Sequence, residues 1–393
     1  MPSDIHRFFP GGSTGLNRIR TNGALSYIAN HSPPTACIVG IADHEHIHLP
    51  GSPMHSTVSI PRPASSSLSG WPAAPVSRLN PGQEATGVAS LPPALNADMC
   101  FASGAGPRLA LYMSMPEATG AVADLTPLLL VHSVNAAASA AELRPVFERY
   151  RSTRPVVAME LPGFGSSQRG PLQYTPPTMA DAILRAVKHL RSEGFRCPVD
   201  VMAVSLSSEF VARAAAFKPS WFRTLALVSP TGMNSARPEA YDAGRTSERR
   251  VLRAVLEMPL WAEGLYRLLT TRASVRYFLK RTWGTPAIDK ALLEYDLLTA
   301  RQPGARHAPL AFISGALFTP GIASLYARLP QPVWVAHGVL GDFTGYQGLS
   351  RIGPPSNRTV DVFSTGALPY FQAPTLFASR YEAFLRHAVP QGA

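Results

Sequence analysis

Cysteine is scarce in this chain, which has only Cys37, Cys100 and Cys197. An odd number of cysteines at wide spacing forms neither a disulfide framework nor a structural zinc motif. The sequence also lacks an apolar run long enough to cross a membrane, and its N-terminus lacks a charged segment followed by an apolar one. We therefore expect no membrane partner, no standard signal peptide and a reducing, cytoplasmic compartment.

Blocks of like charge are missing too, although the formal net charge is +11. The basic residues are mostly single arginines spread along the chain, whereas nucleic-acid-binding proteins concentrate Lys and Arg in patches. We expect no nucleic-acid partner. Apolar residues make up 46% of the 393 residues, which is enough for the core of two average domains or of one large domain with insertions.

Residues 1–96 are rich in Gly, Pro, Ser and Asn, a composition that predicts a disordered extension. A transit peptide, or upstream sequence from a mis-assigned start, is an alternative. His44, His46 and His48 alternate, so on a strand they would share one face and offer imidazole ligands to a metal such as zinc. No further ligand accompanies them, which favours a solvated loop. We expect no metal and no cofactor.

From residue 97 to 393, short apolar segments alternate with segments of helical periodicity. Segments 99–102 and 109–113 flank a Gly-rich turn and predict an antiparallel hairpin. Further strands are predicted at 128–132, 155–159, 199–204, 224–228, 333–336 and 360–363, and helices at 140–150, 179–193, 207–216 and 377–387. This alternation predicts an α/β domain with a mostly parallel eight-stranded sheet, covered by helices on both faces.

The strand signal stops between residues 231 and 330. Five short helices are predicted there, at 248–256, 260–269, 275–283, 288–299 and 309–317. Inserted between two parallel strands, they would lie over the carboxyl ends of the strands, where open α/β sheets bind ligands. We therefore predict a helical cap. Its aromatic side chains would line a pocket or pack the cap against the domain, and their helical spacing favours packing.

Ser205 lies at the predicted turn between strand 199–204 and the following helix. Ala203 and Ser207, two residues to either side, are small, as a sharp strand-to-helix turn requires where the two backbones pass closely. The pattern is a relaxed nucleophile elbow in which alanine and serine replace the usual glycines. An ordinary turn with a helix-capping serine is the alternative. The flanking strand and helix favour the elbow.

Residues 99–385 resemble the α/β-hydrolase fold in its form with a helical cap. The resemblance rests on Leu130-Val131-His132-Ser133-Val134-Asn135, on Glu160-Leu161-Pro162-Gly163-Phe164-Gly165-Ser166-Ser167, and on the elbow. It implies that Ser205 is a nucleophile and that the backbone N–H groups of Val134 and Leu206 form an oxyanion hole. Ser133 replaces the family's glycine. The serine at the elbow argues against the dehalogenase and epoxide-hydrolase branches, which use aspartate.

The resemblance also locates the remaining two members of a catalytic triad. The acid should follow strand 333–336, where Asp342 is the candidate, unless it only caps a turn. The histidine should lie in loop 364–372, which contains none, and Tyr370 stands at the expected position. Tyrosine, with an ordinary pKa near 10, is a poor base at neutral pH. His337 is the better substitute, because His132 matches a residue that is normally structural.

Two functions are compatible with these residues. The first is a serine hydrolase that cleaves an ester, thioester or related small acyl substrate through an acyl-enzyme on Ser205. The second is a catalytically impaired relative that keeps the pocket as a small-molecule binding module, as the tyrosine at 370 suggests. The nucleophile, acid and oxyanion motifs favour the hydrolase. The oligomeric state has no signature in the sequence.

Overall fold

The computed structural model describes residues 91–102, 104–116, 126–234, 239–349 and 357–388. Most of the predicted disordered extension, with the three alternating histidines and Cys37, lies outside these ranges. Cys100 and Cys197 are both free thiols. None of the described helices combines the length and the apolar character that a membrane crossing needs. Within the same ranges, no three His, Cys, Asp or Glu residues are grouped so that they could hold a metal ion.

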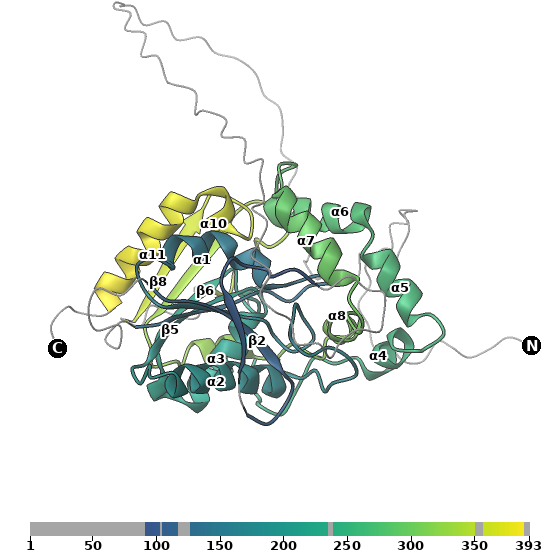
Figure 1. The fold of residues 1–393 in the computed structure, drawn as a ribbon, viewed down its shortest axis with the longest axis horizontal. Helices are drawn as coiled ribbons and strands as arrows, with labels where there is room; N and C mark the ends of the chain where they lie inside the picture. The colour runs from purple at the N-terminus through teal and green to yellow at the C-terminus, as the bar shows by residue number, and fades with distance from the viewer. Residues whose placement is uncertain (1–90, 103, 117–125, 235–238, 350–356, 389–393) are drawn as a thin grey trace, which may run out of the picture. The chain divides into compact units, whose positions relative to one another are not determined.

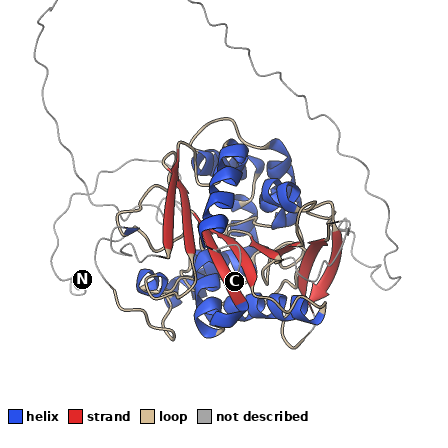
Figure 2. Ribbon diagram, turned by 90° about the vertical axis from the view of Figure 1, so that its left-hand side faces the viewer, coloured by secondary structure: helices blue, strands red, loops and turns tan. Residues whose placement is uncertain are grey.

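The described strands form one eight-stranded sheet in the order β1-β2-β4-β3-β5-β6-β7-β8. The strands are β1 (Asp98–Ala102), β2 (Leu109–Ser114), β3 (Leu128–Val131), β4 (Val156–Met159), β5 (Val199–Val204), β6 (Phe222–Val228), β7 (Val333–Gly338) and β8 (Arg358–Phe363). The β1–β2 and β2–β4 pairs are antiparallel, and all others are parallel. Figure 2 shows the twist of this sheet. The predicted hairpin and the mostly parallel sheet are confirmed.

The central strands separate two apolar cores, because successive side chains of a strand point to opposite faces. In β5, Val201 and Ala203 face one core, and Met202 and Val204 face the other. The helices that cover the first face are α2 (Pro176–Ser192), α3 (Ser207–Phe217) and α9 (Ile322–Tyr326). Those on the second face are α1 (Arg144–Tyr150), α10 (Pro369–Gln372) and α11 (Pro374–Ala388). Figure 1 shows the two layers on opposite sides of the sheet.

Five helices between β6 and β7 match the five predicted for the insertion. They are α4 (Arg250–Leu256), α5 (Ala262–Leu269), α6 (Arg272–Trp283), α7 (Lys290–Ala300) and α8 (His307–Ile313). The insertion contacts loops that follow the carboxyl ends of strands. The Tyr266 hydroxyl of α5 donates to the Ala136 carbonyl after β3, at 2.9 Å. Arg169, after β4, donates to Thr299 of α7 at 2.5 Å.

A buried carboxylate joins the two ends of the insertion to α3. Glu209 accepts hydrogen bonds from the Thr231 hydroxyl, after β6, at 2.5 Å and from the Thr319 N–H, before α9, at 2.8 Å. Burial raises the pKa of Glu209 to about 7, even though both hydrogen bonds favour the charged form. This contact fixes the base of the insertion against the first helix after Ser205.

The folded part of the chain begins before the predicted boundary at residue 97. Ala94 and Leu95 are each only 2% exposed. The Ala94 N–H donates to the Tyr112 hydroxyl at 3.1 Å, and the Tyr295 hydroxyl donates to the Pro92 carbonyl at 2.8 Å. Residues from at least 91 onward therefore belong to the packed domain rather than to the extension.

Candidate functional site

Ser205 lies at the end of β5 in a left-handed conformation, with φ of +55°. Its N–H donates to the Val228 carbonyl of the adjacent β6 at 2.8 Å, and its own carbonyl accepts from Ser208 in the first turn of α3. A non-glycine residue in this region costs about 1–2 kcal/mol, and such strain is concentrated at functional sites. The turn between strand and helix is therefore as sharp as the sequence pattern predicts, and Ser205 is only half-buried at its apex.

Two backbone N–H groups beside Ser205 are available to a ligand. Val131 of β3 pairs with Ala203 of β5, so Val134 and Leu206 each lie three residues beyond paired positions. The Ser207 hydroxyl also donates to the His132 carbonyl at 2.5 Å, which links the two loops. Neither the Val134 nor the Leu206 N–H donates to any residue that the structure describes. Two N–H groups without described protein partners at adjacent strand ends are the donors that an oxyanion hole would use.

Ser133, which replaces the family's glycine, has a partner that the sequence analysis missed. Its N–H and its hydroxyl both donate to the Glu142 carboxylate, the hydroxyl at 2.9 Å. Glu142 lies in the 3₁₀ helix η2 (Ala140–Leu143) and is 4% exposed. Burial raises its pKa to about 7. The sequence contained one signal for this contact. Glu142 is an acidic residue in an alanine-rich segment, and Ser133, nine residues earlier, offers a hydroxyl donor that glycine lacks.

His132 is structural, as the sequence analysis expected. Its Nδ1 donates to the Ser133 carbonyl at 2.6 Å, and its Nε2 accepts from the Leu161 N–H at 3.0 Å. Burial lowers the pKa of His132 to about 4. A neutral imidazole with both nitrogens occupied has no lone pair with which to act as a base.

The loop after β4 is built around Glu160, which stands where the family has aspartate. Its carboxylate accepts hydrogen bonds from the backbone N–H groups of Ala140, at 3.1 Å, and Ser166. Gly165 has φ of +49°, and a Cβ there would lie 1.8 Å from the Glu160 carboxyl carbon. Only glycine permits the backbone to wrap this closely around the carboxylate.

His337 lies in β7, two strands from Ser205 in the sheet. The Ser229 N–H, directly after β6, donates to the Ala336 carbonyl, so Ser205, Ser229 and His337 lie at the carboxyl ends of three adjacent strands. Two strand spacings are about 10 Å. The imidazole stacks on Tyr346 with ring centroids 3.8 Å apart, and its Nδ1 donates to the Gly338 carbonyl at 3.0 Å. Burial lowers the pKa of His337, so the ring is neutral at pH 7 with an unprotonated Nε2.

Asp342 lies at the surface, toward the insertion. Its carboxylate forms an ion pair with Arg281 of α6, and its side chain is 29% exposed. Its N–H also donates to the Arg281 carbonyl at 3.2 Å. Within the described residues, Asp342 has no hydrogen bond to His337 or to Ser205.

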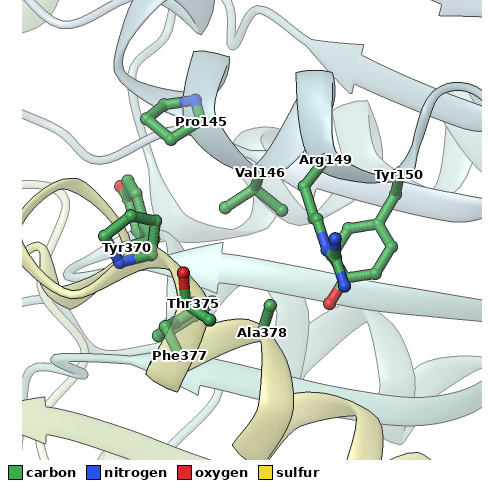
Figure 3. A pocket seen from close by; sticks show the side chains of 9 residues that line it. Pro145, Val146, Arg149, Tyr150, Tyr370, Thr375, Phe377 and Ala378 are labelled. Carbon is green, nitrogen blue, oxygen red and sulfur yellow. The ribbon is translucent and has the colours of Figure 1, made fainter. Parts of the chain in front are cut away.

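Tyr370 lies in the core between α1 and α11. It borders a cavity of about 120 Å³ with Val146 and Phe377, and Figure 3 shows these side chains around it. Its hydroxyl is buried and has no partner among the described residues. Burial, and secondarily the charge of Glu142, raise the pKa of Tyr370 well above its ordinary value.

Ala367 of loop 364–372 contacts the residue that follows β6. Its carbonyl accepts a hydrogen bond from the Ser229 hydroxyl at 2.7 Å, and its side chain is buried. Ser229 immediately follows Val228, the residue whose carbonyl accepts from the Ser205 N–H. Ala367 thus contacts the strand end next to Ser205, whereas Tyr370 lies in the core, and the histidine position of this loop stays a prediction. The structure brings Ser205 close to Val134 and Leu206, leaves His337 two strands away, and turns Asp342 toward α6.

Solved structures with the same arrangement of strands and helices include several hydrolases. A serine hydrolase involved in carbazole degradation (CarC) is 18% identical at a TM-score of 0.56, over 73% of this chain and 98% of its own. Carboxylesterase CesB from Bacillus subtilis is 15% identical at 0.53, over 75% and 93%. A variant of the meta-cleavage product hydrolase CumD from Pseudomonas fluorescens IP01 is 14% identical at 0.53, over 72% and 96%. No protein-family model and no curated protein matches the chain.

Proposed function

Because the chain has the α/β-hydrolase fold, we propose that it is a serine hydrolase that cleaves an ester, thioester or related acyl bond through an acyl-enzyme on Ser205. A fold alone does not assign a function, so the proposal depends on the site. The observation that carries it is the strained serine at the end of β5 beside the N–H groups of Val134 and Leu206.

In the proposed reaction, the Ser205 hydroxyl oxygen attacks the substrate carbonyl and forms a tetrahedral intermediate. The N–H groups of Val134 and Leu206 would donate to the oxygen that becomes negative. The hydroxyl proton would pass to Nε2 of His337, through a water molecule if the side chains do not meet, and then to the leaving group. Water would release the acyl group by the same steps in reverse.

The proposed enzyme should be slow, because no carboxylate is hydrogen-bonded to the His337 imidazole among the described residues. In serine proteases, loss of the carboxylate that orients the histidine lowers kcat by about 10⁴. The oxyanion hole and substrate binding alone still accelerate hydrolysis by about 10³–10⁴ over water. Turnover of an activated ester that depends on Ser205 is therefore the expected activity.

The second candidate is a small-molecule binding module, and the separation of Ser205, His337 and Asp342 favours it. With no assembled triad, the N–H groups of Val134 and Leu206 would hold a carboxylate or another acceptor in its ground state. The site at Ser205 would then bind an acid or an ester without cleaving it.

A fluorophosphonate probe and an activated ester separate the two candidates. The hydrolase predicts labelling at Ser205, located by mass spectrometry, and p-nitrophenyl acetate turnover that Ser205→Ala abolishes. His337→Gln should lower kcat, whereas the matched change His387→Gln, at an exposed position of α11, should not. If Ser205 is not labelled and Ser205→Ala leaves the measured turnover unchanged, the hydrolase proposal fails and the binding module stands.

A further inference from the structure

The loop that carries Val134 is fixed by side chains along its length. The Ser133 N–H and hydroxyl donate to the two oxygens of Glu142. The Asn135 side-chain amide donates to the Ser133 hydroxyl at 3.1 Å and accepts from the Ala137 N–H at 2.8 Å. Glu142 is the one titratable group in this chain of hydrogen bonds, and in its ionised form it accepts hydrogen bonds that are stronger than those between neutral groups.

The two peptide groups before Val134 are both constrained. Glu142 accepts from the Ser133 N–H and so orients the peptide between His132 and Ser133. His132 Nδ1 donates to the Ser133 carbonyl at 2.6 Å and so orients the next peptide, to which the Val134 N–H belongs. In a planar trans peptide the N–H points opposite to the C=O. The Val134 N–H is therefore directed away from His132.

Among the described residues, the Glu142 carboxylate accepts hydrogen bonds from Ser133 of this loop and from no other residue. It is 4% exposed, and its described hydrogen-bond donors are the N–H and hydroxyl of Ser133. Asp296 of α7 and Tyr370 of α10 are the other titratable groups that its charge affects. Loss of the Ser133 hydroxyl would leave the buried carboxylate with the residue-133 N–H as its one described donor, which makes the two residues interdependent.

We propose that Glu142 is a positioning residue for the oxyanion hole, which through Ser133 directs the Val134 N–H toward the acyl oxygen on Ser205. The inference rests on the proposed hydrolase function. It assigns the serine that replaces the family's glycine a purpose: Ser133 supplies two donors to one buried carboxylate, where glycine would supply one.

The test compares kcat and KM for p-nitrophenyl acetate in the full chain and in Glu142→Gln, Ser133→Ala and the double variant. Glutamine has the shape of glutamate, but only one of its two terminal atoms can accept a hydrogen bond. We therefore expect Glu142→Gln to keep the fold and to loosen the loop that carries Val134. Misplacement of a catalytic group by about 1 Å costs about 10²-fold. We expect kcat to fall about 10- to 100-fold in each single variant with KM within about threefold, and the double variant to resemble the single ones.

Glu209→Gln is the matched control, since Glu209 is also fully buried with a pKa raised by burial to about 7, but its partners lie at the base of the insertion. Its kcat should stay within about threefold of the wild type. The inference is overturned if Glu142→Gln also keeps its kcat while Ser205→Ala abolishes turnover, or if Glu209→Gln loses as much.

Failure of the proposed function gives a different result, since the wild type would then show no turnover that depends on Ser205. In that event, amide hydrogen exchange over residues 133–138 decides the positioning role. Glu142→Gln should speed exchange there at least about tenfold and leave exchange after β8 unchanged. Equal exchange in the two proteins would refute the inference.

Discussion

Replacing Ala367 by histidine should restore a general base beside Ser205. The Ala367 carbonyl contacts the Ser229 hydroxyl at 2.7 Å, and Ser229 follows the strand to which the Ser205 N–H is bonded. An imidazole at position 367 would thus start from the strand end adjacent to the nucleophile. Tyr370→His is the matched control, because it places the same ring in the core between α1 and α11.

The expected gain exceeds the structural cost. General-base assistance accelerates a reaction by about 10²–10⁴, which is about 3–5 kcal/mol of barrier. Ala367 is 6% exposed, so the larger ring costs about 1–3 kcal/mol of folding free energy through overpacking. The Arg281–Asp342 ion pair lies at the surface and contributes less than about 1 kcal/mol, so Asp342 can turn toward the new imidazole at little cost.

The assay is kcat/KM for p-nitrophenyl acetate in the wild type, Ala367→His, Ala367→His with Arg281→Leu, and Tyr370→His. We expect a rise of at least about 100-fold with Ala367→His, a further rise when Arg281 is removed, and none with Tyr370→His. All of the gain should vanish when Ser205→Ala is added. A folded Ala367→His protein with wild-type kcat/KM, or a gain that survives loss of the serine, would refute the assignment of position 367.

Three further predictions concern stability. Burial raises the pKa of Glu209 from an ordinary 4.5 to about 7, so the folded state binds the proton more tightly and stability falls as pH rises from about 4.5 to 7. Linkage then predicts that, between pH 5 and 8, the unfolding free energy measured in urea falls by about 2.5 kcal/mol less for Glu209→Gln than for the wild type. By thermal melting, Gly165→Ala should destabilise more than Gly170→Ala, because only the first adds a clash to a positive φ. Deletion of residues 1–90 should leave the melting temperature nearly unchanged, whereas deletion of 1–96 should lower it, since that removes two buried side chains and two hydrogen bonds.

The fold could be predicted from sequence because its elements have strong local patterns. The buried parallel strands are β-branched apolar runs, and the hairpin and the five insertion helices carry their own turn and periodicity signals. The two short helices α9 and α10 were missed because four or five residues hold too little periodicity. The start of the domain was placed late because Ala94 and Leu95 are buried only by contacts with residues distant in sequence.

The sequence predicts the positions of the site residues only where those positions follow directly from a strand assignment. Ser205, Val134 and Leu206 lie at fixed offsets from paired strands, so a strand assignment was enough to place them. Loop 364–372 has no such register. Its Gly366 N–H is bonded to Gln372, so the chain folds back into α10 and carries Tyr370 into the core. That turn depends on tertiary contacts, so counting along the loop could not place its side chains.

The two candidate functions use the same N–H donors to bind an oxygen of the ligand. They differ in whether the Ser205 hydroxyl must also give up its proton. The N–H groups near Ser205 would stabilise negative charge whether it belongs to a bound carboxylate or to a transition state. Only a hydrolase needs a nearby lone pair that can take the serine proton. His337 offers a lone pair from two strands away, because its Nδ1 hydrogen bond to Gly338 leaves Nε2 unprotonated. Tyr346→Ala, which removes the ring stacked on His337, should therefore distinguish the two functions. If the variant changes turnover but not carboxylate affinity, the His337 imidazole takes part in the chemistry. If turnover and affinity change together, the Tyr346 ring only shapes the binding site.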